Sequence, residues 1–134
     1  MSFEHLIRGL RSITAIPVTP FTPDGNVDWM SFRQLVGRLV DDGIQVVTPN
    51  GNTGEFYALS RDECTQAVEV AAAAIGDHTL LLPGVGYDVA TAVEMGRLAE
   101  HVGAAGIMIH QPIHPYQSPQ GWLSYHQAIA RALP

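Results

Sequence analysis

The stretch VVTPNGNTGEFYALS, residues 46–60, joins a buried-strand pattern to a turn of unusual composition. Val46 and Val47 form an apolar run, and a helical pattern begins at Ser60. Between them, residues 51–55 read Gly-Asn-Thr-Gly-Glu, which cannot contribute to an apolar core. Such a turn can instead present backbone N–H groups and small hydroxyl or amide side chains to a negatively charged group. We therefore interpret it as a candidate anion-binding loop.

The same alternation of an apolar run with an amphipathic helix occurs four times along the chain. Buried strands are predicted within residues 12–20, 44–49, 79–86 and 106–112, because these runs are apolar and bounded by proline or glycine. Strands that are apolar throughout, alternating with helices, indicate a parallel sheet covered by helices. The long polar loops follow the strands, which is the side where α/β folds place their sites.

Capping patterns predict where the helices begin. Asp28 precedes an amphipathic stripe that includes Phe32 and Val36, and Ser60 and Glu63 have the spacing of a capping box. Thr91 and Glu94 repeat that spacing before the third helix. The fourth helix is predicted to begin at Ser118 with Pro119 in its first turn.

Two architectures fit four strand–helix units: a small doubly wound sheet, or the amino-terminal half of a TIM (β/α)8 barrel. A complete barrel needs about 250 residues, and the sequence has 134. Four parallel strands alone would leave both edges of the sheet unpaired, which favours aggregation. We therefore expect residues 1–134 to form a single partial (β/α)8-barrel domain of the α/β class. The other half is either absent from this sequence or supplied by another chain.

Composition excludes several classes of protein. The formal charge is −6, and the seven basic residues are scattered arginines, which argues against nucleic-acid or anionic-membrane partners. No apolar run reaches the roughly 20 residues of a membrane span, and the amino terminus does not resemble a secretory signal. The single cysteine, Cys64, fits a reducing cytoplasm and is expected to pack in the core. The sequence contains no lysine.

Three segments together resemble the dihydrodipicolinate synthase / N-acetylneuraminate lyase family: AIPVTPFTPDGNVD (15–28), GNTGEFYALSRDE (51–63) and GIMIHQPIHPYQSPQGW (106–122). The pentapeptide of residues 51–55 is similar to the family's G-x-x-G-E motif after the second strand. A G-x-G at residues 84–86, which we expect to pack closely at the barrel mouth, follows the third strand. The resemblance covers nearly the whole chain in order.

This resemblance implies a (β/α)8 barrel that assembles as a homo-oligomer, a tetramer or dimer. It also implies a class I aldolase-type lyase whose lysine forms a Schiff base with a 2-oxo acid such as pyruvate, without a cofactor or metal. By the same resemblance Gly51, Asn52, Thr53 and Gly54 bind the substrate carboxylate, and Glu55 braces the loop. The family's lysine and main catalytic tyrosine lie on its sixth and fifth strands, beyond the four strands of this chain.

The loop after the fourth strand departs from the synthase pattern. His114 occupies the position where synthases carry a tyrosine, and Tyr116 lies two residues away. Synthases also tend to have threonine in place of Asn52. These departures favour a sister activity on a sugar-derived 2-oxo acid, with His114 and Tyr116 as candidate catalytic residues and His114 as a proton shuttle near neutral pH.

The sequence leaves two other functions open. A half-barrel that pairs with a copy of itself could bind a 2-oxo or sugar acid without catalysis, which the absence of lysine allows. A metal-dependent aldolase would use His110 and His114 as ligands, but the sequence offers no obvious third ligand. We therefore predict no metal site. His126 is expected to be a partly exposed helical residue.

Overall fold

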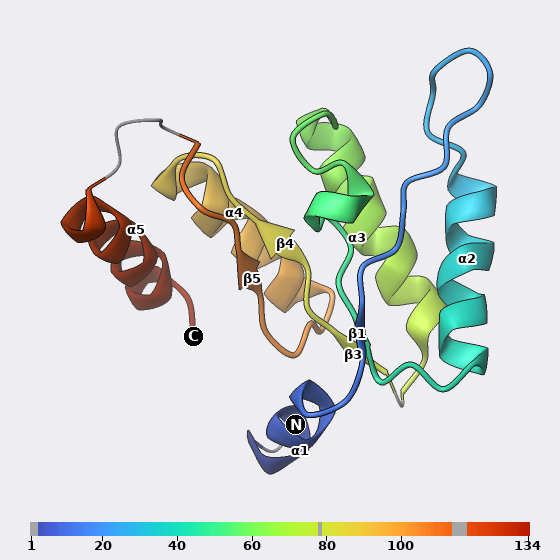
Figure 1. Ribbon diagram of the computed structural model, residues 1–134, viewed down its shortest axis with the longest axis horizontal. Coiled ribbons are helices and arrows are strands. Elements are labelled where there is room, and N and C mark those ends of the chain that lie inside the picture. The colour runs from blue at the N-terminus through green and yellow to red at the C-terminus, as the bar shows by residue number, and fades with distance from the viewer. Residues whose placement is uncertain (1–2, 78, 114–117) are drawn as a thin grey trace.

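The computed structural model describes residues 3–77, 79–113 and 118–134, and its helices and strands alternate as the sequence predicts (Figure 1). The elements are, in chain order, α1 (Phe3–Leu10), β1 (Thr14–Ala15), α2 (Trp29–Asp41), β2 (Val46–Val47), η1 (Asn52–Gly54), α3 (Arg61–Ile75), β3 (Leu80–Leu81), β4 (Gly84–Val85), α4 (Val89–His101), β5 (Met108–Ile109) and α5 (Pro119–Ala132). The regular ladders are shorter than the apolar runs in the sequence, at two residues per strand.

The strands form a parallel sheet in chain order. β1 pairs with β2, β2 pairs with β3, and β4 pairs with β5. β3 and β4 are two parts of one extended run that is interrupted at Pro83, which has no N–H to donate. Pro83 still takes part through its carbonyl, which accepts a hydrogen bond of 2.9 Å from the amide of Met108. The result is four consecutive parallel strands, the arrangement expected for half of a barrel.

The helices α2, α3, α4 and α5 lie side by side in the order of the chain (Figure 1). α2 packs on α3, α3 on α4, and α4 on α5. The predicted apolar face of α2 is confirmed, because Phe32 and Val36 are buried against Val47 of β2 and Leu81 of β3. Ala67 and Ala71 of α3 belong to the same cluster, so one core joins two helices to the middle of the sheet.

Three of the four predicted helix starts are confirmed. Asp28 caps α2 by accepting a hydrogen bond from the Ser31 amide, and Ser118 caps α5 with Pro119 in the first turn. Ser60 and Glu63 form the reciprocal capping box at α3. Each of these caps uses a side chain and an amide that are three residues apart, which is why the local pattern predicts them.

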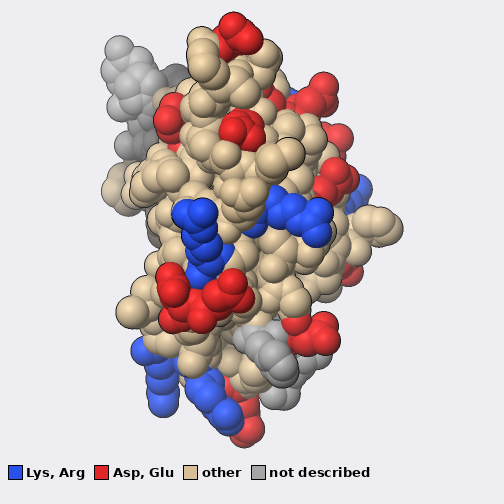
Figure 2. Space-filling model, turned by 90° about the vertical axis from the view of Figure 1, so that its right-hand side faces the viewer, with Lys and Arg blue, Asp and Glu red and all other residues tan. Residues whose placement is uncertain are grey.

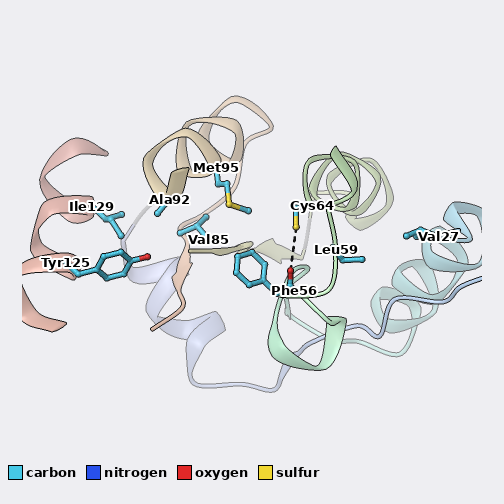
Figure 3. Packing of buried hydrophobic residues seen from close by; sticks show 9 residues of the cluster. All are labelled: Val27, Phe56, Leu59, Cys64, Val85, Ala92, Met95, Tyr125 and Ile129. Carbon is cyan, nitrogen blue, oxygen red and sulfur yellow. Dashed lines mark hydrogen bonds between the residues drawn. The ribbon is translucent and has the colours of Figure 1, made fainter. Parts of the chain in front are cut away.

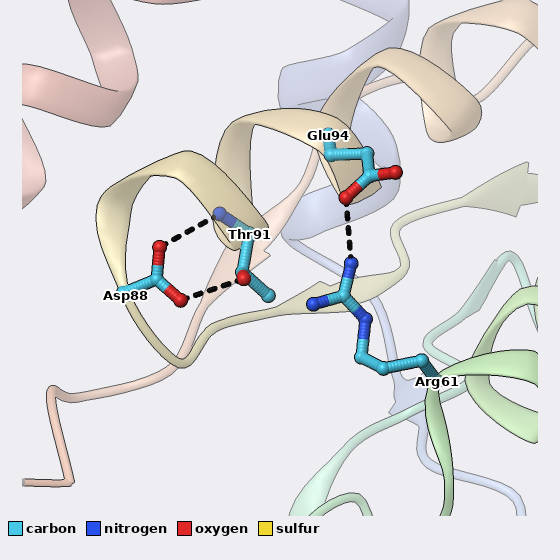
Figure 4. Close-up of polar contacts among 4 residues, drawn as sticks. All are labelled: Arg61, Asp88, Thr91 and Glu94. Atoms are coloured by element: carbon cyan, nitrogen blue, oxygen red, sulfur yellow. Dashed lines mark hydrogen bonds and ion pairs between the residues drawn. The ribbon is translucent and has the colours of Figure 1, made fainter.

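The capping box predicted at Thr91 and Glu94 is wrong (Figure 4). The cap of α4 is Asp88, whose carboxylate accepts from the Thr91 amide at 3.0 Å and from the Thr91 hydroxyl at 2.6 Å. Glu94 instead pairs with Arg61 of α3, with 2.9 Å between Oε2 and Nη2. Two capping patterns overlap in this turn, Asp88 with Thr91 and Thr91 with Glu94. The first of them forms the cap.

α1 was not predicted from the sequence. This short helix lies at the amino-terminal ends of the strands, where Gly9 packs directly against Leu80 of β3 and Val46 of β2. A side chain at Gly9 would overlap the Leu80 side chain, so the close approach requires glycine. The placement of α1 depends on contacts with residues far along the chain, which local sequence periodicity does not indicate.

A second buried cluster lies at the opposite, carboxyl-terminal end of the sheet (Figure 3). Phe56 is fully buried there, with Val85 of β4 and Met95 of α4 in the same cluster. Cys64 is 1% exposed, which confirms the expected packing role. Through Phe56 and Leu59, this cluster anchors the loop that follows β2.

The two outer strands mark where the sheet is open. Ile13, next to β1, is 70% exposed, and both residues of β5 are only partly buried. A cavity of about 430 Å³ lies beside β5, between α4 and the end of α5, and is lined mainly by small and aliphatic side chains. These are the edges that a further half-barrel would cover.

The face of the molecule that carries α2 shows acidic and basic side chains interspersed among uncharged ones (Figure 2). Basic side chains do not form a continuous surface on this face among the described residues. In the same described ranges no helix is long and apolar enough to cross a membrane.

Candidate functional site

The predicted anion-binding loop lies directly after β2, at the carboxyl-terminal end of the sheet. Residues 48–51 continue the buried path of the strand, whereas Asn52 and Thr53 are exposed. η1 is a single 3-10 turn over Asn52–Gly54 that reverses the chain before α3. The sequence therefore places a rigid strand end, an exposed polar turn and a helix start within 15 residues.

Two residues in the left-handed conformation flank the turn. Asn50 has φ 60° and Glu55 has φ 60°, and neither is glycine. The Gly54 amide donates to the Gly51 carbonyl at 3.0 Å, and the Glu55 amide donates to the Asn52 carbonyl at 3.1 Å. Glu55 thus helps to close the turn through its backbone amide, and the bracing role that the resemblance implies for this residue stays a prediction.

The exposed amides that remain for a ligand are those of Asn52 and Thr53. Within the described part of the chain, the amides of Asn52 and Thr53 make no hydrogen bond. The Gly54 amide is engaged in the turn itself, so its contribution is to shape the loop. Two successive N–H groups beside a threonine hydroxyl are the kind of concave donor set that accepts a carboxylate.

Three side chains from the ends of the other strands hold the carbonyl groups of this loop. The Thr19 hydroxyl donates to the Gly54 carbonyl at 2.7 Å, across 35 residues of sequence. The Tyr87 hydroxyl donates to the Phe56 carbonyl at 3.0 Å. His110 Nε2 lies 2.7 Å from the Asn50 carbonyl oxygen. Because Thr19, Tyr87 and His110 follow β1, β4 and β5, every strand end of the sheet contributes to the loop.

Glycines make this close packing possible. A side chain at Gly51 would overlap Ile16, and one at Gly84 would overlap the Asn50 carbonyl oxygen. The G-x-G after the third predicted strand therefore has the packing role that the sequence predicts. Its second glycine, Gly86, lies against the ring of Phe56.

His110 is 6% exposed and sits in an aromatic setting. Its ring stacks on Phe56, with centroids 4.2 Å apart and an 11° angle between planes, and meets the edge of Tyr57 at 5.3 Å. Because a carbonyl oxygen only accepts hydrogen bonds, Nε2 must carry the hydrogen in the bond to Asn50. Burial lowers the pKa of His110 below its ordinary 6.5, although the hydrogen bond to Asn50 opposes this shift.

From the sequence, His110 was a candidate only for a metal site, and its hydrogen bond to the loop was not predicted. The available signal was its position at the end of a buried apolar run, where a polar side chain needs a partner. Its Nε2 is already engaged by a carbonyl oxygen. Within residues 3–77, 79–113 and 118–134, no three histidine, cysteine or acidic side chains gather in a way that could hold a metal ion.

Asn50 and Cys64 tie the loop to α3. The Asn50 side-chain amide donates to the Cys64 carbonyl at 2.9 Å, and the Cys64 thiol lies 3.9 Å from the Phe56 carbonyl (Figure 3). Burial raises the pKa of the Cys64 thiol to about 11. The thiol is therefore protonated at neutral pH and acts in packing.

Two predicted site residues cannot be placed. His114 and Tyr116 lie outside the residues that the structure describes. His126 is partly buried on α5, as predicted, with its ring against Trp122 and Nδ1 2.8 Å from the Trp122 carbonyl oxygen. The described part of the candidate site is thus the loop after β2 and its three braces.

Four strand–helix units with a braced, amide-presenting loop at the carboxyl end of the second strand define the amino-terminal half of a (β/α)8 barrel. Residues 9–134 match the model of the Dihydrodipicolinate synthetase family, and the chain belongs to this family. Its relatives include synthases, dehydratases and lyases, so the family is one of lyases acting on small molecules.

Sequence relatives of two kinds are found. A probable 5-dehydro-4-deoxyglucarate dehydratase of Streptomyces griseus is 39% identical over 98% of this chain and 42% of its own length. A 4-hydroxy-tetrahydrodipicolinate synthase of Heliobacterium modesticaldum is 31% identical over 92% of this chain and 41% of its own length. The chain therefore spans about two fifths of the length of these relatives.

Solved structures confirm the half-barrel prediction over the doubly wound alternative. The dihydrodipicolinate synthase of Bacillus clausii matches with a TM-score of 0.92 and 43% identity, over 96% of this chain and 44% of that one. The N-acetylneuraminate lyase of Mycoplasma synoviae matches with a TM-score of 0.88 at 23% identity, which speaks for the fold alone.

Proposed function

We propose that this chain forms the carboxylate-binding half of a class I aldolase-type lyase that acts on a 2-oxo acid. The observation that carries the proposal is the loop of residues 51–54. It presents two unused amides and the Thr53 hydroxyl at the carboxyl end of β2. The carbonyl of Gly54 within it, and those of Asn50 and Phe56 on either side of it, are held by three other strand ends. Preorganised donors of this kind bind an anion without reorganising when the ligand arrives.

In this proposal the loop orients the substrate for chemistry at its C2 carbonyl. A lysine amine adds to that carbonyl and loses water, and the resulting iminium withdraws electrons from C3 so that a bond there can break. The sequence contains no lysine, so the amine comes from outside these residues. Holding the carboxylate fixes the distance and direction from which the amine attacks.

The second part of the site is the loop after β5. His114 and Tyr116 are proposed to transfer protons or to select the substrate. We further propose that the protein works as a homo-oligomer, a tetramer or dimer, and needs neither cofactor nor metal.

The substrate class that we favour is a sugar-derived 2-oxo acid. Asn52 stands where synthases tend to have threonine, and His114 stands in place of their tyrosine. The 39% identity to a probable 5-dehydro-4-deoxyglucarate dehydratase also favours a sugar-derived substrate. A strict dihydrodipicolinate synthase is therefore the less favoured function.

Borohydride trapping tests the proposal most directly. The protein is expressed from its complete coding sequence, its intact mass is measured, and it is reduced with borohydride in the presence of pyruvate. We expect one reduced pyruvate adduct per chain that contains the lysine. A protein that binds pyruvate but gives no adduct would have no Schiff-base chemistry.

Thr53→Val tests the carboxylate loop separately. Removal of the hydroxyl is expected to raise the pyruvate concentration needed for half-maximal trapping by about tenfold, the effect of losing one hydrogen bond to a charged group. Thr65→Val, at an exposed position on α3, is the matched control and should leave trapping unchanged. Equal trapping by both variants would remove the loop from the site.

The absence of lysine favours one alternative of a different class. A homo-oligomeric half-barrel could bind a 2-oxo or sugar acid through the same loop and perform no chemistry. An intact mass equal to the 14.5 kDa of these residues, together with pyruvate binding but no adduct, would establish this alternative.

A further inference from the structure

We infer that His110 is a positioning residue for the carboxylate loop: its Nε2–H holds the Asn50 carbonyl so that the amides of Asn52 and Thr53 stay free for the substrate. The inference rests on the proposed function. It assigns a role to a buried side chain that lies at the end of a different strand from the loop it orients.

The orientation of the peptide group between Asn50 and Gly51 sets the direction in which the loop leaves β2. A peptide group is planar, so fixing the Asn50 carbonyl also fixes the direction of the Gly51 N–H that leads into the turn. Glycine at position 51 leaves that plane free to rotate, because no Cβ resists the motion. Asn50, at φ 60°, is already in a conformation that most residues avoid. Something outside the loop must therefore hold the plane, and His110 Nε2 at 2.7 Å does so.

The surroundings of the bond leave the carbonyl and the imidazole little room to move. A Cβ at Gly84 would overlap the Asn50 oxygen and lie 2.7 Å from His110 Nε2, so the pair fills the space that glycine leaves. On its other side the imidazole stacks on Phe56. A Cβ at Gly86 would lie 3.1 Å from the His110 Cβ, so this side is also closely packed. Rotation of the imidazole away from Asn50 would break these contacts.

Among the described residues, the groups that bond to or stack on the His110 ring are neutral. The ring has a hydrogen bond with the Asn50 carbonyl and aromatic contacts with Phe56 and Tyr57. Burial raises the pKa of Tyr57, so its phenol stays protonated at neutral pH. The bond to Asn50 is therefore a hydrogen bond between neutral groups in a nearly dry setting, where losing the donor would leave a buried carbonyl unsatisfied.

Two variants separate the hydrogen bond from the ring. His110→Phe keeps a stacking ring and removes the donor, whereas His110→Gln restores an N–H donor of similar reach. His126→Phe is the matched control, because His126 also contacts a backbone carbonyl and an aromatic ring but lies on α5. Each variant is made in the protein expressed from its complete coding sequence, and its fold is checked by circular dichroism and urea unfolding.

We expect His110→Phe to raise the pyruvate concentration for half-maximal borohydride trapping by about tenfold, with a smaller effect on the maximal trapping rate. His110→Gln should return this concentration to within about threefold of the unsubstituted protein, and His126→Phe should not change it. If His110→Phe traps normally while Thr53→Val is weakened, the inference is wrong and the proposed function stands. If neither variant weakens trapping, the loop does not bind the carboxylate and both fail.

A spectroscopic readout covers the case in which His110→Phe does not fold. In the unsubstituted protein labelled with 15N-histidine, the assigned His110 signal should show the Nε2–H tautomer with a slowly exchanging proton. The Nδ1–H tautomer would mean that Nε2 cannot donate to Asn50 and would overturn the inference.

Discussion

The loops after β1 and β2 face the same end of the sheet but are held in opposite ways. The loop of residues 20–28 is closed by its own backbone: Asp28 donates to Pro20 at 2.8 Å, and Thr22 donates to Asn26 at 2.8 Å. It projects beyond the body of the molecule (Figure 1), and Phe21 is 41% exposed. The loop of residues 50–59 also has backbone bonds of its own, but it is held in addition by side chains that come from three other strand ends.

This difference shows that the long-range side-chain hydrogen bonds of the fold are concentrated on the second loop. Apart from Val27, which is buried in the cluster of Figure 3, the first loop is held by hydrogen bonds between its own residues, so changes at its exposed positions should act locally. The second loop depends on residues up to 60 positions away, so it can keep an exposed, amide-presenting turn in one conformation. Such a turn suits recognition of an anion, because the fold already holds the loop in one conformation. Binding then loses little conformational entropy from the loop. Variants in the two loops can test this contrast.

The largest expected effect is at Phe56, compared with Phe21. Phe56→Ala removes a fully buried ring from beneath the second loop and should lower the free energy of unfolding by about 3–5 kcal/mol. Phe21→Ala, in the first loop, should change it by about 0.5 kcal/mol because that ring is largely in solvent. Urea unfolding of both variants measures the difference. Equal losses would show that the two loops are anchored alike.

The next effect is at the threonines that serve each loop. Thr19→Val keeps the shape but leaves the buried Gly54 carbonyl without its donor, for an expected loss of about 1–3 kcal/mol. Thr22→Val removes an exposed acceptor that receives a 3.2 Å bond from the Asn26 amide, and should cost about 0.5 kcal/mol. The same unfolding assay applies. A Thr19 variant as stable as the Thr22 variant would contradict the assigned brace.

The contrast also explains which features could be predicted from sequence. The four strand–helix units and three helix caps depend on residues three to eight positions apart, and their patterns were correct. The bracing of the second loop joins residues 31 to 60 positions apart, which no local pattern records. α1 was missed for the same reason, since Gly9 packs on Leu80. The wrong cap at Thr91 came from two local patterns that overlap.

A smaller effect should separate backbone strain from packing in the first loop. Gly25 has φ +83° and lies in open space, so Gly25→Ala should cost about 1 kcal/mol through conformation alone. Gly25→Asn should lower the free energy of unfolding by only a few tenths of a kcal/mol, because asparagine tolerates the left-handed region. Thermal or urea unfolding distinguishes them. Equal losses from alanine and asparagine would indicate a steric contact rather than backbone strain.

The smallest effect concerns pH and belongs to the second loop alone. Burial lowers the pKa of His110 below 6.5, so the unfolded chain binds a proton in a range where the folded chain does not. Stability from this group is therefore complete above about pH 6.5 and falls as the pH decreases toward the lowered value. The carboxyls of Asp28, Glu63 and Asp88 also have lowered pKa values, but their ordinary values of 3.8 and 4.5 lie below this window.

Unfolding measured in urea between pH 7 and pH 5 isolates the histidine. His110→Gln should flatten the loss of stability in this range, because the variant has no proton to bind there. Thr19→Val is the control, since it removes a brace of the same loop without changing a titrating group, and its curve should run parallel to that of the unsubstituted protein. A His110→Gln curve that also runs parallel would mean that the imidazole is not buried in solution. The second loop would then be held by Thr19 and Tyr87 without a dry histidine bond, and the contrast between the two loops would be smaller than the structure indicates.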